Sequence, residues 1–177
     1  MFIIFEGMDN VGKTTQIFKL ESWFARQGKI VHKLRYNNVE VTDKEHQEYA
    51  FRQYRDILEL TKNSDSVFIA DRFHLGEAVY GNLYRNYDTD ITAVEQGFED
   101  KLILIYLWAP IEELLQREDG QSFAISKEKK ELESRLFIMA FRDSTIRHKV
   151  EFETIRTIAD VQESIRSYIQ MVMSWNR

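Results

Sequence analysis

A glycine-rich stretch near the N-terminus, FEGMDNVGKTTQ, carries the most clearly defined chemistry in the sequence. Its segment from Gly7 to Thr14 satisfies the P-loop pattern G-x-x-x-x-G-K-[ST], in which backbone N–H groups wrap a phosphate chain. Lys13 is expected to reach the β- and γ-phosphates of a nucleoside triphosphate such as ATP, and the hydroxyl of Thr14 to ligate Mg²⁺. The residues predicted to contact this nucleotide are Gly7, Asn10, Val11, Gly12, Lys13, Thr14 and Thr15.

Two acids and an arginine extend the prediction beyond the nucleotide. Asp71 and Arg72 directly follow the apolar run SVFIA, at the end of an expected strand. Asp71 is placed to support Mg²⁺ through water, and Arg72 to hold a phosphate with two hydrogen bonds. A structural ion pair at the strand end is the alternative. Asp9 lies inside the phosphate loop, where an acid is unfavourable beside phosphates, so we expect it to face a hydroxyl of a second substrate.

Phe51 and Arg55 are four residues apart in an expected helix, Asp43–Thr61, and therefore share one of its faces. An aromatic ring beside a guanidinium can recognise a nucleobase, because the ring stacks and the arginine donates to a base carbonyl. The alternative is that Phe51 belongs to the core and Arg55 to the solvated surface.

Short apolar runs alternate with helical patterns along the whole chain, which predicts an α/β protein. The expected strands are Phe2–Phe5, Ile30–Tyr36, Ser66–Ala70, Leu102–Trp108 and Phe152–Thr157. The first expected helix follows the glycine-rich turn and runs to about Gln27, and the second spans about Asp43–Thr61. A helical stretch follows Arg72 and is broken around Asn86–Asp90. The remaining helices begin at Pro110, span about Lys127–His148 and occupy the C-terminal segment. This order predicts one domain, residues 1–177, with a three-layer P-loop NTPase fold: a five-stranded parallel sheet with helices on both faces. Both motifs would lie at the carboxyl ends of strands, where such sheets bind ligands.

Composition excludes several classes of function. The 177 residues carry a net charge of −5, which argues against sequence-independent binding of a nucleic-acid polymer. There is no cysteine, and hence neither a disulfide framework nor a thiolate metal site. No apolar run approaches the roughly 20 residues that cross a bilayer, and Glu6 interrupts any signal-peptide pattern. We therefore expect a cytoplasmic protein without a membrane partner.

The sequence lacks the motifs that are typical of other classes of P-loop protein. A GTPase switch would carry an Asn-Lys-x-Asp segment, and no asparagine here is followed by lysine. A motor ATPase would show an acidic strand end with a neighbouring glutamate in a larger chain. A small-molecule kinase is therefore favoured.

Four segments in the right order make the sequence resemble the thymidylate kinases. FEGMDNVGKTTQ resembles their P-loop, including the acid at Asp9, and YAFRQYR places Phe51 and Arg55 at the spacing of the thymine-stacking and base-reading residues. ADRFHLGEAVYG resembles their Asp-Arg-aromatic motif, with Tyr80 matching an aromatic that lines the nucleotide sugar. FETIRTIADVQESIRSYI resembles the final strand and helix, which pack near adenine. The resemblance implies transfer of the γ-phosphate of ATP to a deoxynucleoside monophosphate, dTMP above all, with Arg72 holding its phosphate. It also implies a homodimer.

The chain departs from the family pattern at three places. The segment LRYNNVE lacks the usual proline after the second strand, and Arg35 and Tyr36 are expected to take over part of its role in binding the substrate. Gly76 stands where a serine is expected. A short lid is expected around residues 117–130, with Arg117 as its one arginine beside several lysines. Charge on the transferring phosphoryl group would then be stabilised by Lys13, Arg117 and Mg²⁺.

Two alternatives stay open. A deoxynucleoside kinase would phosphorylate a neutral 5′-hydroxyl and need a general base, for which Glu40 is the nearby candidate. A nucleotide-binding module without phosphoryl transfer would not require Arg72. The base preference is equally open, because another monophosphate can fill the same role.

Overall fold

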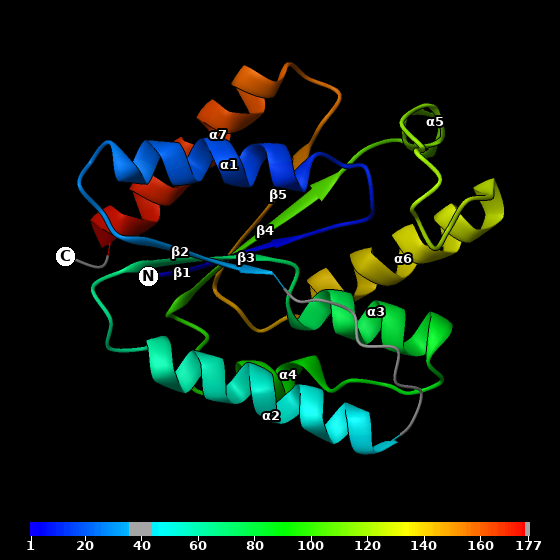
Figure 1. Cartoon of the computed structure of the whole chain (residues 1–177), viewed down its shortest axis with the longest axis horizontal. Coiled ribbons are helices and arrows are strands. Elements are labelled where there is room, and N and C mark those ends of the chain that lie inside the picture. Colours follow the sequence, from blue (N-terminus) through cyan, green and yellow to red (C-terminus); the bar gives the residue numbers. More distant parts are fainter. Residues whose placement is uncertain (36–43, 176–177) are drawn as a thin grey trace.

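The computed structural model describes residues 1–35 and 44–175, and within them a five-stranded parallel sheet forms the centre (Figure 1). Its strands are β1 (Phe2–Glu6), β2 (Val31–Arg35), β3 (Val67–Asp71), β4 (Leu102–Trp108) and β5 (His148–Glu153). Their spatial order is β2-β3-β1-β4-β5, and every neighbouring pair is parallel. The carboxyl ends of all these strands therefore meet at one edge, as the alternation of elements predicts.

Helices cover both faces of the sheet. They are α1 (Lys13–Ala25), α2 (Lys44–Thr61), α3 (His74–Tyr84), α4 (Ile91–Glu95), α5 (Ile111–Gln116), α6 (Lys127–Asp143) and α7 (Ile158–Trp175). In Figure 1, α1 and α7 lie on one side of the sheet, and α2, α3 and α4 on the other. The predicted three-layer P-loop fold is confirmed. The expected break between two helices before β4 is also present, because α3 ends at Tyr84 and α4 begins at Ile91.

The core consists of two apolar clusters separated by the sheet. β1 is buried along its whole length, and its side chains alternate between the faces. Ile3 and Phe5 belong to the cluster that includes α1 and α7, whereas Phe2 and Ile4 pack with the cluster that includes α2 and α4. This double burial explains why β1 and β4 read as uninterrupted apolar runs. It also fixes the end of β1, from which the P-loop begins.

Two predicted boundaries near the C-terminus are wrong. The helix expected to reach His148 ends at Asp143, and the strand expected at Phe152–Thr157 spans His148–Glu153. β5 is an edge strand whose residues are only partly buried, so it lacks the apolar run that marks β1 and β4. It pairs with β4 in register from Ile103 opposite His148. The other expected strands agree with the described residues to within two positions.

Lys149 explains where α6 stops. Its ammonium donates to the carbonyls of Phe141, Arg142 and Ser144 at 2.9, 2.9 and 2.6 Å. These carbonyls belong to the last turn of α6 and the residue that follows it, where backbone acceptors lack partners within the helix. A cation at this end also opposes the negative pole of the helix dipole. A side chain from β5 therefore satisfies the end of α6. None of the described helices is both long and apolar enough to span a lipid bilayer.

Replacing Lys149 with methionine tests this cap. Lys149→Met keeps an unbranched side chain of similar length but removes its three donated hydrogen bonds, so the free energy of unfolding should fall by about 1–3 kcal/mol. Urea unfolding would measure the change as a lower midpoint with an unchanged slope. Lys129→Met, at an exposed position of the same helix, is the matched control and should stay within about 0.5 kcal/mol of the wild type. Equal midpoints for both variants would contradict the cap.

Candidate functional site

The P-loop turns sharply from β1 into α1, and glycine is required where it does so. Gly7 has a φ of 137°, and a Cβ built on it would lie 2.2 Å from the backbone oxygen of Leu107. Gly12, at the start of α1, has a φ of 88° in the left-handed region. Since other residues adopt such angles at a cost, both glycines of the motif are explained by the backbone path. The turn presents the N-terminus of α1, a favourable place for phosphate.

Lys13 is buried at this turn and folds back onto the loop. Its ammonium donates to the carbonyls of Gly7 and Met8 at 2.9 and 2.6 Å. Burial and, to a smaller extent, the nearby Arg72 lower the pKa of Lys13 to about 7, although Asp9 and Asp71 act in the opposite direction. An anionic ligand would offset this burial and the repulsion from Arg72. The binding of a phosphate by Lys13 stays a prediction.

Thr14 and Asp71 come together across the sheet edge, as expected for a magnesium site. The Thr14 hydroxyl donates to Asp71 Oδ2 at 3.2 Å, and Asp71 ends β3 opposite Phe5 of β1. The Thr14 hydroxyl and the Asp71 carboxylate both offer hard oxygen atoms, the ligand type that Mg²⁺ prefers. Phosphate oxygens and water usually complete the octahedral shell of this ion. The residues present therefore fit Mg²⁺.

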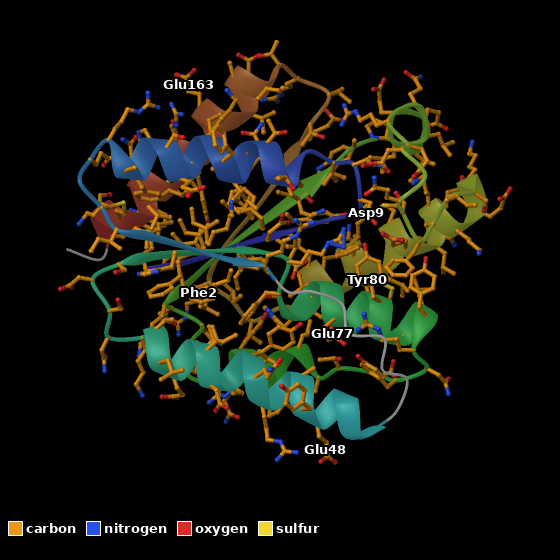
Figure 2. All side chains as sticks on the ribbon, viewed as in Figure 1. Phe2, Asp9, Glu48, Glu77, Tyr80 and Glu163 are labelled. Carbon is orange, nitrogen blue, oxygen red and sulfur yellow. The ribbon has the colours of Figure 1, made fainter. Side chains whose placement is uncertain are left out.

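Arg72 is held in an unusual backbone conformation that directs its side chain toward the P-loop. Its φ is 69°, a left-handed value that residues other than glycine rarely adopt. The guanidinium donates to Asp9 Oδ1 at 2.5 Å and to the Tyr80 hydroxyl at 2.7 Å, and it lies 4.8 Å from the centre of the Tyr80 ring. Figure 2 labels Asp9 and Tyr80 in this part of the molecule. The structure therefore brings together three predicted site residues, Asp9, Arg72 and Tyr80.

Glu133 of α6 completes this cluster, and sequence reasoning missed it. Its carboxylate accepts hydrogen bonds from the hydroxyls of Tyr80 and Tyr84 at 2.8 and 3.4 Å. Burial raises the pKa of Glu133, and the hydrogen bond from Tyr80 opposes that shift. The available signal was its position, because Glu133 lies three residues after Lys130 and four before Phe137, both buried on the same face. A carboxylate on the buried face of a helix needs donors, and here tyrosines provide them.

A cavity of about 700 Å³ joins these elements at the carboxyl edge of the sheet. The predicted site residues that line it are Asp9, Asn10, Gly12, Lys13, Thr14, Thr15, Asp71, Arg72 and Arg117. Arg35, at the end of β2, also lines it, so the described part of the chain brings four cationic side chains to one cavity. Gly7 and Val11 shape the loop behind the cavity, and Tyr80 contacts Arg72. Tyr36 and Glu40 lie outside the described residues.

Arg117 reaches the cavity from the end of α5. Its guanidinium donates to the hydroxyl and the carbonyl of Thr154 at 3.3 and 3.1 Å and lies 3.6 Å from Glu113. It thereby joins the end of α5 to the segment between β5 and α7. Ile155 of that segment and Ile158, the first residue of α7, are about half exposed, at 52% and 53%.

The segment after Arg117 is tied down at three points. Ser122 accepts a hydrogen bond from the Asn10 amide at 3.3 Å, and Glu118 accepts one from the buried Lys130 at 2.5 Å. The ring of Phe123 stacks on Tyr84, with centroids 5.1 Å apart. Residues of the predicted lid thus contact both the P-loop and the helices that carry Glu133 and Tyr80.

Phe51 and Arg55 lie away from the lining of this cavity. Phe51 is partly buried against the core cluster on the α2 side of the sheet. Arg55 donates to the carbonyls of Val94 and Gln96 at 3.1 and 2.5 Å, and its guanidinium lies 4.9 Å over the ring of Phe98. In this arrangement Arg55 joins α2 to α4, and its reading of a base stays a prediction.

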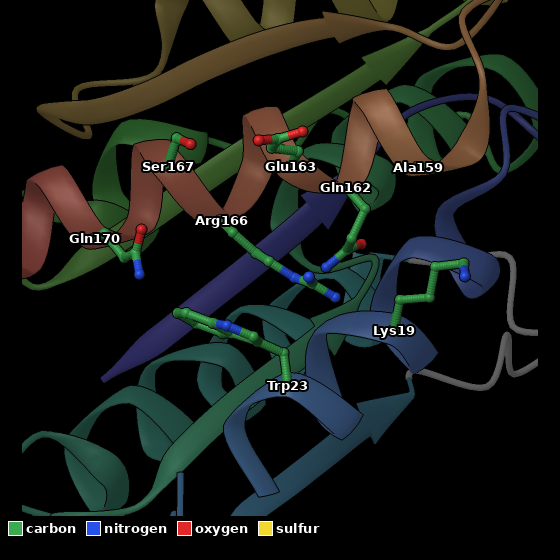
Figure 3. A pocket seen from close by; sticks show the side chains of 8 residues that line it. All are labelled: Lys19, Trp23, Ala159, Gln162, Glu163, Arg166, Ser167 and Gln170. Atoms are coloured by element: carbon green, nitrogen blue, oxygen red, sulfur yellow. The ribbon is translucent and has the colours of Figure 1, made fainter. Parts of the chain in front are cut away.

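A second hollow, of about 500 Å³, lies between α1 and α7 (Figure 3). Arg166 extends from α7 toward α1, with its guanidinium 5.9 Å from the centre of the Trp23 ring. Lys19 and Glu163, which also line the hollow, carry opposite charges. Because the phosphate-binding loop faces the other cavity, we assign the candidate site there.

Solved structures with this fold include two nucleotide-bound proteins. The YorR protein of Bacillus subtilis, in complex with phosphorylated GDP, matches with a TM-score of 0.76 at 19% identity over 97% of this chain and 96% of that one. Deoxyadenosine kinase of M. mycoides, with its products dCMP and a flexible dCDP bound, matches with a TM-score of 0.62 at 19% identity over 97% of this chain and 100% of that one. No family model and no curated protein matches the sequence. At this identity the likeness shows that the chain shares their fold.

The lowered pKa of Lys13 predicts proton uptake when a polyphosphate binds. At pH 8 the free lysine is mostly neutral, since its pKa is about 7, and phosphate oxygens favour the charged ammonium. Binding of ATP at pH 8 should therefore take up most of one proton, and at pH 6 almost none. Calorimetry in buffers of different ionisation enthalpy measures this number. A binding heat at pH 8 that is independent of the buffer would show that Lys13 is already charged.

Proposed function

We propose that this protein is a nucleoside-monophosphate kinase that transfers the γ-phosphate of ATP to a deoxynucleoside monophosphate, with dTMP giving dTDP as the preferred reaction. The observation that carries the proposal is the shared cavity, which is lined both by the P-loop and by Arg35 and Arg72. A protein that only binds a nucleoside triphosphate has no need of this second pair of arginines. A second phosphate facing the first would use them.

On the donor side, the P-loop wraps the phosphates of ATP and Lys13 moves from the carbonyls of Gly7 and Met8 to the β- and γ-phosphates. Thr14 and Asp71 would hold Mg²⁺, which when bound neutralises charge on the β- and γ-phosphates. Arg117 contributes the lid cation beside the transferring group. The half-exposed Ile155 and Ile158 offer an apolar surface for the donor base near Arg117.

On the acceptor side, Arg72 and Arg35 hold the monophosphate in line with the γ-phosphate. Arg72 is bound to Asp9 and Tyr80 in this structure, so an acceptor phosphate would replace one of these partners. Asp9, once released, faces the sugar of the acceptor and can accept a hydrogen bond from a hydroxyl. Catalysis then consists of positioning and charge neutralisation, with little covalent participation by the protein.

We further propose that the acceptor base lies against Phe51, with Arg55 reading a base carbonyl. Both side chains belong to α2, and the guanidinium of Arg55 already binds two carbonyl oxygens. A base carbonyl would take the place of the Gln96 oxygen. The proposed preference for thymine rests on these two residues.

A deoxynucleoside kinase is the second candidate, and the carboxylates around Arg72 favour it. Asp9 binds Arg72 directly, and Glu133 binds it through Tyr80. Transfer to a 5′-hydroxyl requires a general base, and an acid with a raised pKa such as Glu133 suits that role. In this reading Arg72 would position the base rather than a phosphate.

An ADP-release assay with ATP and Mg²⁺ separates these functions. It would compare dTMP, dUMP, dGMP, dCMP, dAMP and AMP with thymidine as acceptors. Turnover of dTMP above the other monophosphates supports the proposal. Turnover of thymidine without any monophosphate would move the assignment to a deoxynucleoside kinase. No turnover with any acceptor, while ATP still binds, would leave a binding module.

Arg117 is the residue whose loss should affect transfer more than binding. Arg117→Met should lower kcat by at least about 100-fold, because a cation beside the transferring phosphoryl group contributes about 10³–10⁵-fold in related reactions. The KM for ATP should change far less. Arg147→Met is the control, since this arginine is 72% exposed and pairs with Asp100. A normal kcat in Arg117→Met would return Arg117 to a structural role beside Thr154.

A further inference from the structure

Glu6 is a buried acid that the proposed reaction does not yet use. It ends β1, directly before Gly7, and its side chain is 0% exposed. Oε1 accepts hydrogen bonds from three backbone N–H groups, those of Phe73, Leu75 and Gly76, at 2.8, 3.1 and 3.1 Å. The carboxylate at the root of the P-loop therefore holds the beginning of α3.

These N–H groups need a partner from outside the helix. The first N–H groups of a helix lack acceptors within it, and a side chain at the N-cap usually supplies one. Here the N-cap is Phe73, which forms no side-chain cap. Glu6 performs this task from β1. Burial raises the pKa of Glu6, whereas His74, the backbone N–H groups and the positive end of the helix dipole favour its carboxylate form.

Arg72 directly precedes the segment that Glu6 holds. Its own N–H donates to the carbonyl of Phe5 at 2.9 Å, so its backbone is fixed on one side by β1 and on the other by the Glu6 carboxylate. Between these two attachments Arg72 adopts its left-handed φ of 69°. An unfavourable conformation of this kind persists only where the surroundings enforce it. The enforced conformation brings the guanidinium to Asp9 and Tyr80.

The second oxygen of Glu6 shows how closely the site is fitted around it. Oε2 is buried and has no hydrogen-bond partner among the residues that the structure describes. A Cβ added to Gly76 would lie 3.2 Å from it and 3.6 Å from Cβ and Cδ of Arg72. Gly76 therefore leaves room for both the carboxylate and the arginine.

We propose that Glu6 is a positioning residue that couples the P-loop to Arg72 and thereby sets the affinity for the acceptor phosphate. The inference rests on the proposed function, because that function gives Arg72 its phosphate. Glu6 itself would touch neither substrate. Its carboxylate links the element that binds the donor to the element that binds the acceptor.

Glu6→Gln tests the coupling with little change in shape. The amide oxygen is a weaker acceptor than a carboxylate, and the amide nitrogen places unpartnered donors where Oε2 lies. The KM for dTMP should rise by at least about 10-fold, the equivalent of one lost hydrogen bond to a charged group, while the KM for ATP should change less than about 3-fold. Equal changes in both constants, or none in either, would overturn the proposal.

Glu95→Gln is the matched control. Glu95 is also 0% exposed and contacts α3 through His74, whose Nε2 lies 2.7 Å from its Oε1. Its hydrogen-bond partners are His74, Ser144 and Thr145, and Arg72 is not among them. This variant should lower Tm at least as much as Glu6→Gln and leave the KM for dTMP unchanged. A purely structural role for Glu6 would make the two variants alike.

Gly76→Ala perturbs the same carboxylate without removing it, and it serves if Glu6→Gln does not fold. The new methyl group would press on Oε2 of Glu6 at 3.2 Å and meet the Arg72 side chain at an ordinary contact distance of 3.6 Å, while alanine favours the helix. We expect an increase of about 2–5-fold in the KM for dTMP with little change in Tm, in line with a displacement of a few tenths of an ångström. An unchanged KM in this variant would contradict the coupling.

Amide hydrogen exchange tests the role of Glu6 without relying on enzyme activity. In Glu6→Gln the amides of Phe73, Leu75 and Gly76 should exchange at least about 10-fold faster, whereas that of Ile69 in β3 should not, since only the former lose a strong acceptor. Should the wild type transfer no phosphate at all, the proposed function fails, and this measurement still decides whether Glu6 holds the segment that follows Arg72. Unchanged protection of the three amides would overturn the inference even in an active enzyme.

Discussion

Four cationic side chains converge on one cavity, and the local structure around the site depends on how their mutual repulsion is managed. Lys13, Arg35, Arg72 and Arg117 come from four different segments and line the same space. The carboxylates of Asp9, Asp71 and Asp119 line the same cavity and offset part of this positive charge. Burial is the main cause of the lowered pKa of Lys13, and repulsion from Arg72 adds to it. Anionic ligands with several phosphates would relieve the remaining repulsion, so these cationic side chains would favour the binding of such ligands.

Each of three cations has a protein partner that a phosphate oxygen could replace. Lys13 binds backbone carbonyls of the P-loop, Arg72 binds Asp9 and Tyr80, and Arg117 binds Thr154. These partners hold the side chains near the positions that the proposed reaction needs, which lowers the entropy that binding must remove. The carboxyl edge of the parallel sheet makes the arrangement possible, because β1, β2 and β3 end there side by side.

Local patterns in the sequence predicted the donor side of the site and most of the fold. The P-loop could be recognised because its chemistry lies within eight consecutive residues, and Asp71 with Arg72 because they follow an apolar strand. The contact of Tyr80 with Glu133 joins residues 53 positions apart and depends on the packing of α3 against α6. Glu6 reads in the sequence only as a charge within an apolar run, since its partners are backbone amides that no residue pattern reveals. The edge strand β5 was misplaced for a similar reason, because its partly buried residues give no apolar run.

Calorimetric binding of dTMP and of thymidine would show whether Arg72 binds a phosphate of the acceptor, as we propose. The two ligands differ only in that phosphate. We expect the wild type to bind dTMP at least about 10-fold more tightly than thymidine, and Arg72→Ala to remove most of this difference, since a charge-assisted pair contributes about 1.5–3 kcal/mol. Equal affinity of the wild type for both ligands, or a difference that survives in Arg72→Ala, would contradict the account.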